Sequence, residues 1–511
     1  MKSKTSATTA LALFTLLASP LSLVAQGQKV QENETMQSHR YIFVEVPTFG
    51  GPNFWANFTG HPNRLINNRG TLVGGADTLE TDPLCFNVSD CFVMHAFQWQ
   101  EGDLTSLRIL PSGTNSQAFW INDHGLIAGM SQNGQIDPLL GIQELRAVVW
   151  EDSNIIDLGT LEGGYESIAQ SINDRGQVTG LALNTVPDPF APSCGNICPF
   201  FPPTQNRAFL WEGGRMQDLG TLGGPDALGE FINDRGQIVG SSFVSFNPTS
   251  SGLPQIDPFL WEDGEMIDLG SLGGTFGEPV DLNNRGEVVG NMFLMGDATV
   301  HPFLWRRGSL LDLGTFGGTF GNAGAVNDSG VIVGTASYQN DLIFRAFVWK
   351  KGVMTDLGTL KGDDCSIGQK INSRSQIVGA SFSCASGPLS ATLWDNGDVI
   401  DLNGFVPPSS NLHLIGDDIY INDRGVIAGT GVLANGDIHA FVLIPCTEKT
   451  EGCRDATEGP DSKQIGTPIL DSSVPSQPPK SVAADWRAWL AQRHHLPGLA
   501  LSDLRTRVKS R

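Results

Sequence analysis

Residues 232–240 read Ile-Asn-Asp-Arg-Gly-Gln-Ile-Val-Gly, and close variants of this phrase occur eight times in the 511-residue chain. Each copy is followed by a second phrase close to Ala-Phe-Leu-Trp. A repeat of about 50 residues with only short apolar runs is typical of solenoids, propellers and arrays, because one unit cannot bury its hydrophobic face alone. The repeat therefore decides the architecture.

The first phrase predicts a β-hairpin with a type I turn that is closed by a left-handed glycine. Because Asn and Asp side chains can hold such a turn by bonding to its backbone, we interpret Asn173, Asp174 and their equivalents as scaffold rather than as metal ligands or catalytic groups. The seventh copy has Ser375 in place of glycine, so this turn is expected to be strained or of another type. The other copies carry Gly70, Gly125, Gly176, Gly236, Gly286, Gly330 and Gly425.

The second phrase places two large residues two positions apart, so both lie on one face of a strand. The pairs are Phe97 and Trp99, Val148 and Trp150, Phe209 and Trp211, Phe259 and Trp261, Phe303 and Trp305, Phe347 and Trp349, Thr392 and Trp394, and Phe441 and Leu443. Each buried Trp contributes on the order of 4–6 kcal/mol before entropy. We therefore assign these pairs to the core rather than to a ligand cage.

A third phrase, seen as Met-Gln-Asp-Leu-Gly-Thr-Leu-Gly-Gly at residues 216–224, predicts a further strand and a loop. With the apolar stretch before each Ile-Asn, every unit has four short strands, the content of one propeller blade. The first copy of the third phrase, Tyr41–Val46, precedes any Ile-Asn phrase, and the last unit has no copy after it. We therefore predict an all-β, eight-bladed β-propeller over residues 41–445, with four-stranded blades and a ring closed by the N-terminal strand.

The repeats resemble the HAF family of extracellular repeats, whose His-Ala-Phe occurs here at residues 95–97 and 439–441. Asn-Asp-x-Gly, Phe-x-Trp and Asp-Leu-Gly-Thr-Leu-Gly-Gly recur in fixed order along nearly the whole chain up to Cys446. The resemblance implies an exported bacterial protein with propeller-like repeats, and it brings no catalytic residues. Several copies have another residue at the His position, namely Arg146, Arg207, Asp257, Arg345 and Ser390, which argues against a shared catalytic histidine there.

The two ends of the chain differ from the repeats. Residues 1–25 have the layout of a secretory signal peptide, followed by a linker at 26–40, so we expect a secreted protein, extracellular or periplasmic. Residues 446–481 form a polar linker, and 482–511 form a basic amphipathic tail that is expected to be disordered or a short helix. No later segment is apolar enough for a transmembrane helix, and the protein is expected to be a monomer. A formal charge of −22 makes nucleic acid an improbable partner.

The eight cysteines fall into near neighbours, which favours local disulfides in an exported chain. Sequence alone does not prove this connectivity, and no ligand spacing supports a metal site or another cofactor. The candidate pairs are Cys85 with Cys91, Cys194 with Cys198, Cys365 with Cys384, and Cys446 with Cys453.

The connections between the first two phrases are unequal in length. From the last glycine of the first phrase to the Phe-x-Trp pair, the offsets are 23, 19, 29 and 19 residues in the first four units and 13, 13, 13 and 12 in the last four. Insertions on one face are often where repeat proteins bind. The longest, Leu181–Ala208, is either a preorganised binding loop or a lid packed on its neighbour, and its candidate binding residues are Phe190, Phe200, Phe201 and Arg207.

Enzyme signatures such as Gly-x-Ser-x-Gly and His-Glu-x-x-His are missing from the sequence. A carboxylate pair for glycoside chemistry remains open, with Glu80, Asp188 or Glu278 as examples outside the repeat pattern. The leading hypothesis is a non-catalytic propeller that binds an unknown protein or carbohydrate ligand through the long connections of the first four blades. The alternatives are a secreted carbohydrate-active hydrolase or lyase with its site at the channel mouth, and a structural cell-surface module.

Overall fold

The computed structural model describes residues 39–56, 63–84, 91–152, 154–191, 203–385, 388–446 and 453–455. These residues are built almost entirely from β-strands, with a short 3-10 helix, η2 (Leu402–Phe405). The predicted all-β class is therefore confirmed. Within the described ranges, no helix is long and apolar enough to cross a membrane. The predicted signal peptide, the linker 26–40 and the tail 482–511 lie wholly or almost wholly outside these ranges.

The strands follow one another in antiparallel sets of four, which we call units. The first units are β2 (Gly50–Trp55), β3 (Leu72–Thr81), β4 (Phe92–Gln100) and β5 (Asp103–Ser106); β6 (Ser116–Ile121), β7 (Ile127–Ile136), β8 (Gln143–Glu151) and β9 (Asn154–Asp157); β10 (Ser167–Ile172), β11 (Val178–Pro187), β12 (Thr204–Glu212) and β13 (Arg215–Asp218); and β14 (Ala227–Ile232), β15 (Ile238–Pro248), β16 (Pro254–Glu262) and β17 (Glu265–Asp268).

The later strands repeat this pattern. They are β18 (Gly273–Leu282), β19 (Val288–Leu294), β20 (Val300–Arg306) and β21 (Ser309–Asp312); β22 (Gly317–Val326), β23 (Ile332–Tyr338), β24 (Phe344–Lys350) and β25 (Val353–Asp356); β26 (Cys365–Ile371), β27 (Ile377–Phe382), β28 (Ser390–Asp395) and β29 (Asp398–Asp401); and β30 (His413–Ile421), β31 (Ile427–Val432) and β32 (Ile438–Pro445), with β1 (Arg40–Val46) and β33 (Arg454–Asp455).

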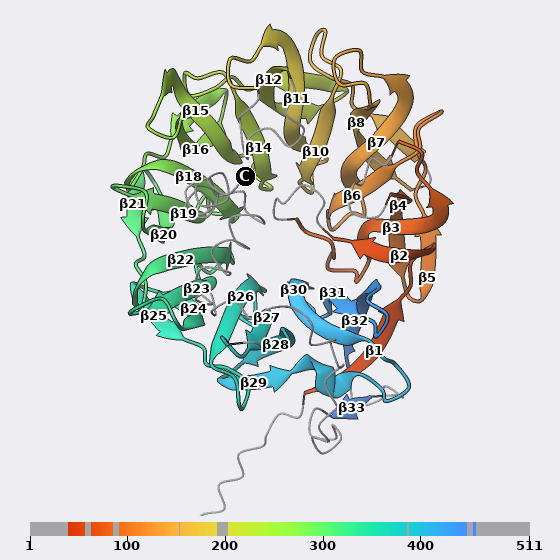
Figure 1. Ribbon diagram of the computed structural model, residues 1–511, viewed down its shortest axis with the longest axis vertical. Helices are drawn as coiled ribbons and strands as arrows, with labels where there is room; N and C mark the ends of the chain where they lie inside the picture. The colour runs from red at the N-terminus through yellow and green to blue at the C-terminus, as the bar shows by residue number, and fades with distance from the viewer. Residues whose placement is uncertain are drawn as a thin grey trace, which may run out of the picture. The chain divides into compact units, whose positions relative to one another are not determined.

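Figure 1 shows the units one after another around a ring, which is the arrangement of a β-propeller. The strand that precedes the first Ile-Asn phrase lies beside the last strands of the chain, because β1 pairs antiparallel with β32 from Tyr41↔Pro445 to Val46↔Ala440. It occupies the position that β5 holds against β4 in the first unit. The two ends of the described chain are thus held in one sheet.

The strands formed by the third phrase are shorter than the sequence predicts. Six of them end at an Asp, as β13 does at Asp218 and β17 does at Asp268, whereas β5 ends at Ser106 and β1 covers the whole predicted range. The carboxylate accepts a hydrogen bond from the backbone N–H two residues later, at 2.8 Å from Gly220 N to Asp218 Oδ1. This contact turns the chain out of the sheet before the glycine.

The core lies within and between neighbouring units, where the Phe-x-Trp pairs are packed as predicted. Phe209, Phe259 and Phe303 are fully buried, and Trp150 is 1% exposed. The indole N–H of Trp150 donates to Arg108 O at 2.7 Å, so the polar atom of this core residue is also satisfied. The described Phe-x-Trp pairs are scaffold.

The Ile-Asn-Asp turns have the expected left-handed residue. Gly236 has φ +84°, and Ser375 adopts the same region with φ +64°. Ser375 N donates to Asn372 O at 3.0 Å, as Gly425 N donates to Asn422 O at 2.9 Å. The seventh turn is therefore of the same type as the others, and its serine carries the strain of a left-handed conformation.

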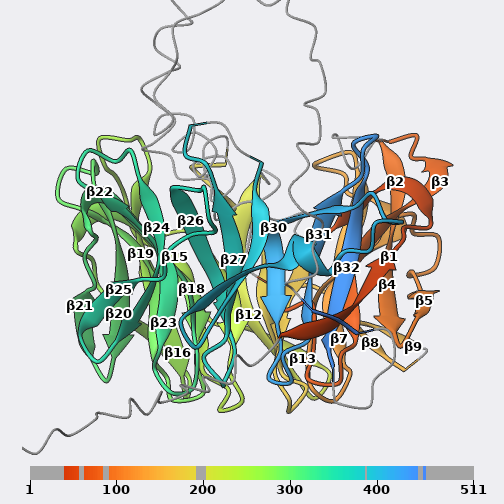
Figure 2. The same ribbon diagram turned by 90° about the horizontal axis from the view of Figure 1, so that it is seen from below.

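Because the four strands of a unit alternate in direction, the turns and the long connections lie at opposite ends of the strands (Figure 2). The Ile-Asn-Asp turns join the first and second strands at one face. The connections between the second and third strands lie at the other face. The fold thus presents two distinct faces on which a functional site can be built.

Candidate functional site

The Asn of the Ile-Asn-Asp phrase links each unit to the next. Its side-chain Oδ1 accepts hydrogen bonds within its own turn, as Asn233 does from Arg235 N and Gln237 N. Its Nδ2 donates at 2.8–3.1 Å to the backbone oxygen of the Asn in the following unit. The donors run through Asn67, Asn122, Asn173, Asn233, Asn283, Asn327, Asn372 and Asn422, and Asn422 donates back to Asn67. We call this series the Asn cycle.

The residue after each Asn forms a second, outer series. In seven of the eight copies its side-chain oxygen accepts the equivalent backbone N–H of the preceding unit, as Asp174 Oδ1 does from Asp123 N at 2.9 Å. Burial tends to raise the pKa of Asp123, but the Arg64 guanidinium and hydrogen bonds from Asn68 lower it more, so this pKa lies below its ordinary value. Carboxylates occupy the position at Asp123, Asp174, Asp234, Asp328 and Asp423.

These turns surround a cavity of about 310 Å³ at their face of the ring. Its wall includes the residue after the Asn in every phrase, together with Arg64, Trp120, Phe231 and Lys370. Trp120 and Phe231 are in edge contact, with ring centroids 5.9 Å apart. The Asn and Asp residues that we interpreted as scaffold therefore also line this cavity.

One carboxyl that sequence selects, Glu278, lies in β18 next to a partner that sequence does not indicate, Glu230 of β14. Burial raises the pKa of Glu278 to about 7, although Asn291 donates to it. Burial and the charge of Glu278 hold the pKa of Glu230 well above its ordinary value, against a hydrogen bond from Ser241 Oγ at 2.8 Å. Neither residue is in the wall of the cavity, so the carboxyl pair and the opening are separate features.

The opposite face carries the long connections. Phe190 is only partly buried, and its ring packs on Phe243 of the following unit with centroids 6.0 Å apart. Arg207 bonds to Asp218 at 3.1 Å and to Pro225 O at 3.4 Å, beside its own strand. The structure therefore places Phe190 in a packing contact and Arg207 in an ion pair, while Phe200 and Phe201 lie outside the described residues.

The connections are shorter than the sequence offsets imply, because the strands extend into them. In place of an insertion over residues 181–208, β11 continues to Pro187 and β12 begins at Thr204. We define the rim as residues 78–84, 136–143, 184–191 and 245–254, which are the described parts of the long connections and the adjoining strand ends. Glu80 is exposed in the rim, and Asp188 is buried there.

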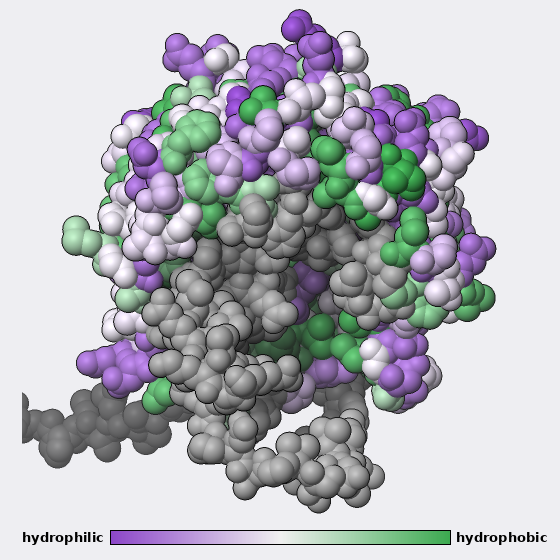
Figure 3. All heavy atoms as spheres, turned by 45° about the horizontal axis from the view of Figure 1, so that its top comes forward, coloured by the Kyte–Doolittle hydropathy of each residue, from purple (hydrophilic) through white to green (hydrophobic). Residues whose placement is uncertain are grey.

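Large apolar side chains are exposed along the rim in each of the first four units. Leu79 is 76% exposed and Phe246 is 54% exposed. The full set is Leu79, Leu84, Ile136, Leu139, Val186 and Phe246. Figure 3 shows one side of the molecule, on which hydrophobic residues lie between hydrophilic ones. Sequence reasoning located the connections but not these side chains, since an isolated apolar residue at a strand end gives no periodic signal.

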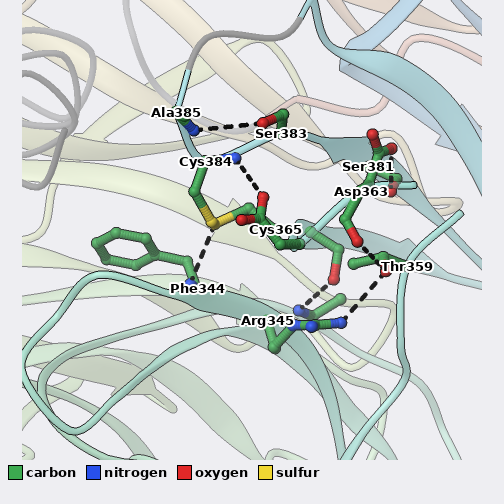
Figure 4. The surroundings of a disulfide bond; sticks show 12 residues. Phe344, Arg345, Thr359, Asp363, Cys365, Ser381, Ser383, Cys384 and Ala385 are labelled. Atoms are coloured by element: carbon green, nitrogen blue, oxygen red, sulfur yellow. Dashed lines mark hydrogen bonds between the residues drawn. A yellow bond between two sulfur atoms is a disulfide. The ribbon is translucent and has the colours of Figure 1, made fainter. Parts of the chain in front are cut away.

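Two of the four predicted cysteine pairs are disulfides in the structure, Cys365–Cys384 and Cys446–Cys453. Cys91 is also disulfide-bonded, and Cys85, Cys194 and Cys198 lie outside the described residues. Around the first disulfide, Phe344 N contacts Cys365 Sγ and Asp364 accepts from Cys384 N (Figure 4). Because both sulfurs are consumed in the bond, this cluster of Asp and Cys residues is a structural staple rather than a metal site.

The chain matches no protein-family model, and no curated protein matches it. It is similar to the β-propeller domain of the Trilobed protease from Pyrococcus furiosus, with 11% identity and a TM-score of 0.38 over 66% of this chain and 93% of that one. It is also similar to Porphyromonas gingivalis dipeptidyl peptidase 4, with 9% identity and a TM-score of 0.37 over 75% of this chain and 66% of that one. No argument about function rests on likenesses at these TM-scores.

Proposed function

We propose that this chain is a secreted propeller of the HAF type that binds a protein partner through the rim of its first four units. We further propose that it has eight blades and that β1 closes the ring. The antiparallel pairing of β1 with β32 and the return of the Asn cycle from Asn422 to Asn67 support this architecture. The two disulfides support the proposal that the protein is located in an oxidising compartment. The removable leader at residues 1–25 is proposed from the sequence alone.

The observation that carries the binding proposal is the row of exposed apolar side chains on the rim. Ile136 and Leu139 are 53% and 52% exposed on either side of the buried Asp137, which anchors their connection. Apolar side chains held outward by ordered backbone lose little entropy when a partner covers them. They are therefore suited to become the buried centre of an interface.

The chemistry of these residues favours a protein over a carbohydrate. The exposed members are mainly aliphatic, namely Leu79, Leu84, Ile136, Leu139 and Val186, with Phe246 as the aromatic exception. Branched aliphatic side chains pack well against other apolar side chains. Sugar rings instead call for flat aromatic faces together with polar groups that fix their orientation.

The test is a binding screen of residues 26–511 against immobilised extracellular proteins and glycans. The rim variant Ile136→Ser with Leu139→Ser is compared with wild type for every ligand found. Leu311→Ser with Val353→Ser is the matched control, because these side chains are 42% and 62% exposed on β21 and β25, away from the rim.

We expect the rim variant to weaken binding by about tenfold for each side chain that the partner buries, with the control unchanged. Equal binding by wild type, rim variant and control would remove the rim from the proposal. A screen in which only glycans bind would replace the protein partner with a carbohydrate.

A second candidate function is a hydrolase or lyase, and the observation that favours it is the pair of Glu230 and Glu278. Burial raises the pKa of both carboxyls, that of Glu278 to about 7, and carboxyls with raised pKa values are the groups that acid–base chemistry needs. A polysaccharide turnover screen with wild type and Glu278→Gln tests this candidate. Turnover that disappears in the variant would support the enzyme, and turnover that the variant retains would exclude a role for this pair.

A further inference from the structure

Three rim connections are fastened to the next unit by the same arrangement of side chains. An Asp at the start of each connection accepts an N–H from the residue two positions later. These contacts are Leu84 N to Asp82 Oδ1 at 3.0 Å, Leu139 N to Asp137 Oδ1 at 2.6 Å, and Phe190 N to Asp188 Oδ1 at 2.9 Å. Each Asp is paired with the residue before the first strand of the following unit, Asn115, Glu166 or Asp226 respectively, and we call each such pair a latch.

The second member of each latch accepts a hydrogen bond from a backbone N–H. Asn115 Oδ1 accepts from Met94 N at 2.8 Å, Glu166 Oε2 accepts from Leu145 N at 2.6 Å, and Asp226 Oδ1 accepts from Asn206 N at 2.8 Å. The three amides occupy equivalent positions in β4, β8 and β12. Each second member therefore ties the next unit to the strand that follows the connection.

The latches differ in what lies between their two side chains. In the first, Asn115 Nδ2 donates to Asp82 Oδ2 at 2.9 Å. In the second, Asp137 Oδ2 and Glu166 Oε1 are buried and accept from no donor among the described residues. In the third, the same is true of Asp188 Oδ2 and Asp226 Oδ2. Two carboxyls thus stand where the first latch has a carboxylate and an amide donor.

We propose that Asp137–Glu166 and Asp188–Asp226 each share one proton, so that two rim connections are latched at low pH and loosened at high pH. Two buried carboxylate oxygens without a donor repel one another, and a single proton supplies the missing hydrogen bond. The proton then does what the Asn115 amide does in the first latch. A calcium ion fits less well, because it takes 6–8 oxygen ligands, and two of the four carboxyl oxygens in each pair already accept from backbone N–H groups.

The charges around the pairs agree with this assignment. Burial, followed by the charges of Asp137 and Glu144, raises the pKa of Glu166 to about 9. Arg146 does not neutralise the pair, because it is ion-paired with Glu144 at 2.6 Å. Burial and then Asp188 raise the pKa of Asp226 to about 7, and the Arg207 charge opposes this rise without cancelling it. Burial also raises the pKa of Asp188.

The direction of the pH effect follows from these shifts. A carboxyl whose pKa is higher in the folded than in the unfolded state stabilises the fold at low pH, and this contribution is lost as the pH rises toward the folded pKa. The window therefore runs from the ordinary pKa values up to about 9 for Glu166 and about 7 for Asp226. Within it, opening of a latch becomes more favourable by up to about tenfold per pH unit.

The consequence for binding rests on the proposed function. Ile136 and Leu139 flank Asp137, and Val186 lies two residues before Asp188. A loosened latch releases these apolar side chains from fixed positions, so affinity for a rim partner is expected to fall with rising pH. The latch itself can be tested without any partner.

The experiment is hydrogen exchange with mass spectrometry on residues 26–511 at pH 5, 6, 7 and 8, corrected for intrinsic exchange. We expect protection of the segments that contain Leu145 and Asn206 to fall by up to about tenfold per pH unit inside each window. The segment that contains Met94 is the internal control, because its latch already has an amide donor. Its corrected protection should not follow this trend.

Glu166→Gln and Asp226→Asn convert the two pairs into the amide type and should remove the pH trend at their own segments. Asn115→Asp makes the reverse change and should create the trend at Met94. Identical profiles in all three segments, or variants without effect on the trend, would overturn the proposal. Protection that chelator removes at pH 8 and calcium restores would also overturn it, in favour of a bound cation.

The two proposals fail separately. Loss of the pH trend in hydrogen exchange refutes the shared proton, whatever the partner is. A normal trend with no rim-dependent ligand in the binding screen refutes the proposed function and leaves the latch intact.

Discussion

The Asn cycle provides the sharpest stability prediction, at Asn233. Its side chain is 5% exposed and makes hydrogen bonds in both directions. Nδ2 donates to Asn283 O at 3.0 Å and to Gln237 Oε1 at 2.7 Å, and Oδ1 accepts from Arg235 N and Gln237 N. Asn233→Ala therefore leaves two backbone N–H groups and one backbone oxygen without this partner.

The expected loss follows from those three groups. A buried polar group left unsatisfied costs about 1–3 kcal/mol. The turn borders the cavity, so water can reach part of it, and the lower end of the range applies. We therefore expect Asn233→Ala to reduce the free energy of unfolding by about 3 kcal/mol, or roughly 150-fold in the folding equilibrium.

The assay is urea unfolding at pH 7, followed by tryptophan fluorescence. Asn233→Asp separates the two halves of the contact, because it keeps the accepting oxygen and removes the donor facing Asn283 O. Its second carboxylate oxygen would face Asn283 O and Gln237 Oε1, and this repulsion should make it at least as destabilising as the alanine variant. Asp234→Asn is the neighbouring control at an exposed site and should stay within about 0.5 kcal/mol of wild type. A loss below about 0.5 kcal/mol for Asn233→Ala would refute the idea that the cycle holds adjacent units together.

Three further changes have defined outcomes. Ser375→Gly relieves the left-handed serine (φ +64°) and should raise the free energy of unfolding by about 0.5–1 kcal/mol, whereas Gly425→Ser should lower it by a similar amount in the same urea assay. Cys365→Ala with Cys384→Ala opens a 19-residue separation and should cost about 3 kcal/mol, while wild type under reducing conditions should lose at least as much, because its other disulfides are reduced too. Glu278→Gln should remove the part of the pH dependence of stability that appears as the pH rises from its ordinary pKa to about 7, and an unchanged pH profile of urea midpoints would contradict this.

Much of the fold follows from short-range sequence. The left-handed glycine, the Asn that bonds to its own turn, and the paired Phe and Trp all act within a few residues, so the repeat reveals them directly. Phe259 and Trp261 are buried in the core, as expected for two large apolar residues two positions apart on one face of a strand. The pairing of β1 with β32 was also open to prediction, because a spare strand at one end and a missing strand at the other are visible in the repeat order.

The candidate sites depend on contacts between units, and sequence spacing carries little information about these. Asn233 donates to a residue 50 positions later, and Glu230 and Glu278 come from the first strands of two adjacent units. The carboxyl latches show the same limit, since Asp188 alone looks like an isolated loop acid. Its role becomes clear only when the next unit places Asp226 against it.

The proposal that the rim, and not the turn face, binds the partner can be tested directly by a hydrogen-exchange footprint. The ligand from the binding screen is added to residues 26–511 at pH 6, where the latches are expected to be closed. We predict new protection at residues 78–84, 136–143, 184–191 and 245–254, with none at the Ile-Asn-Asp turns around the cavity. Protection confined to those turns would contradict the account and move the binding site to the channel mouth.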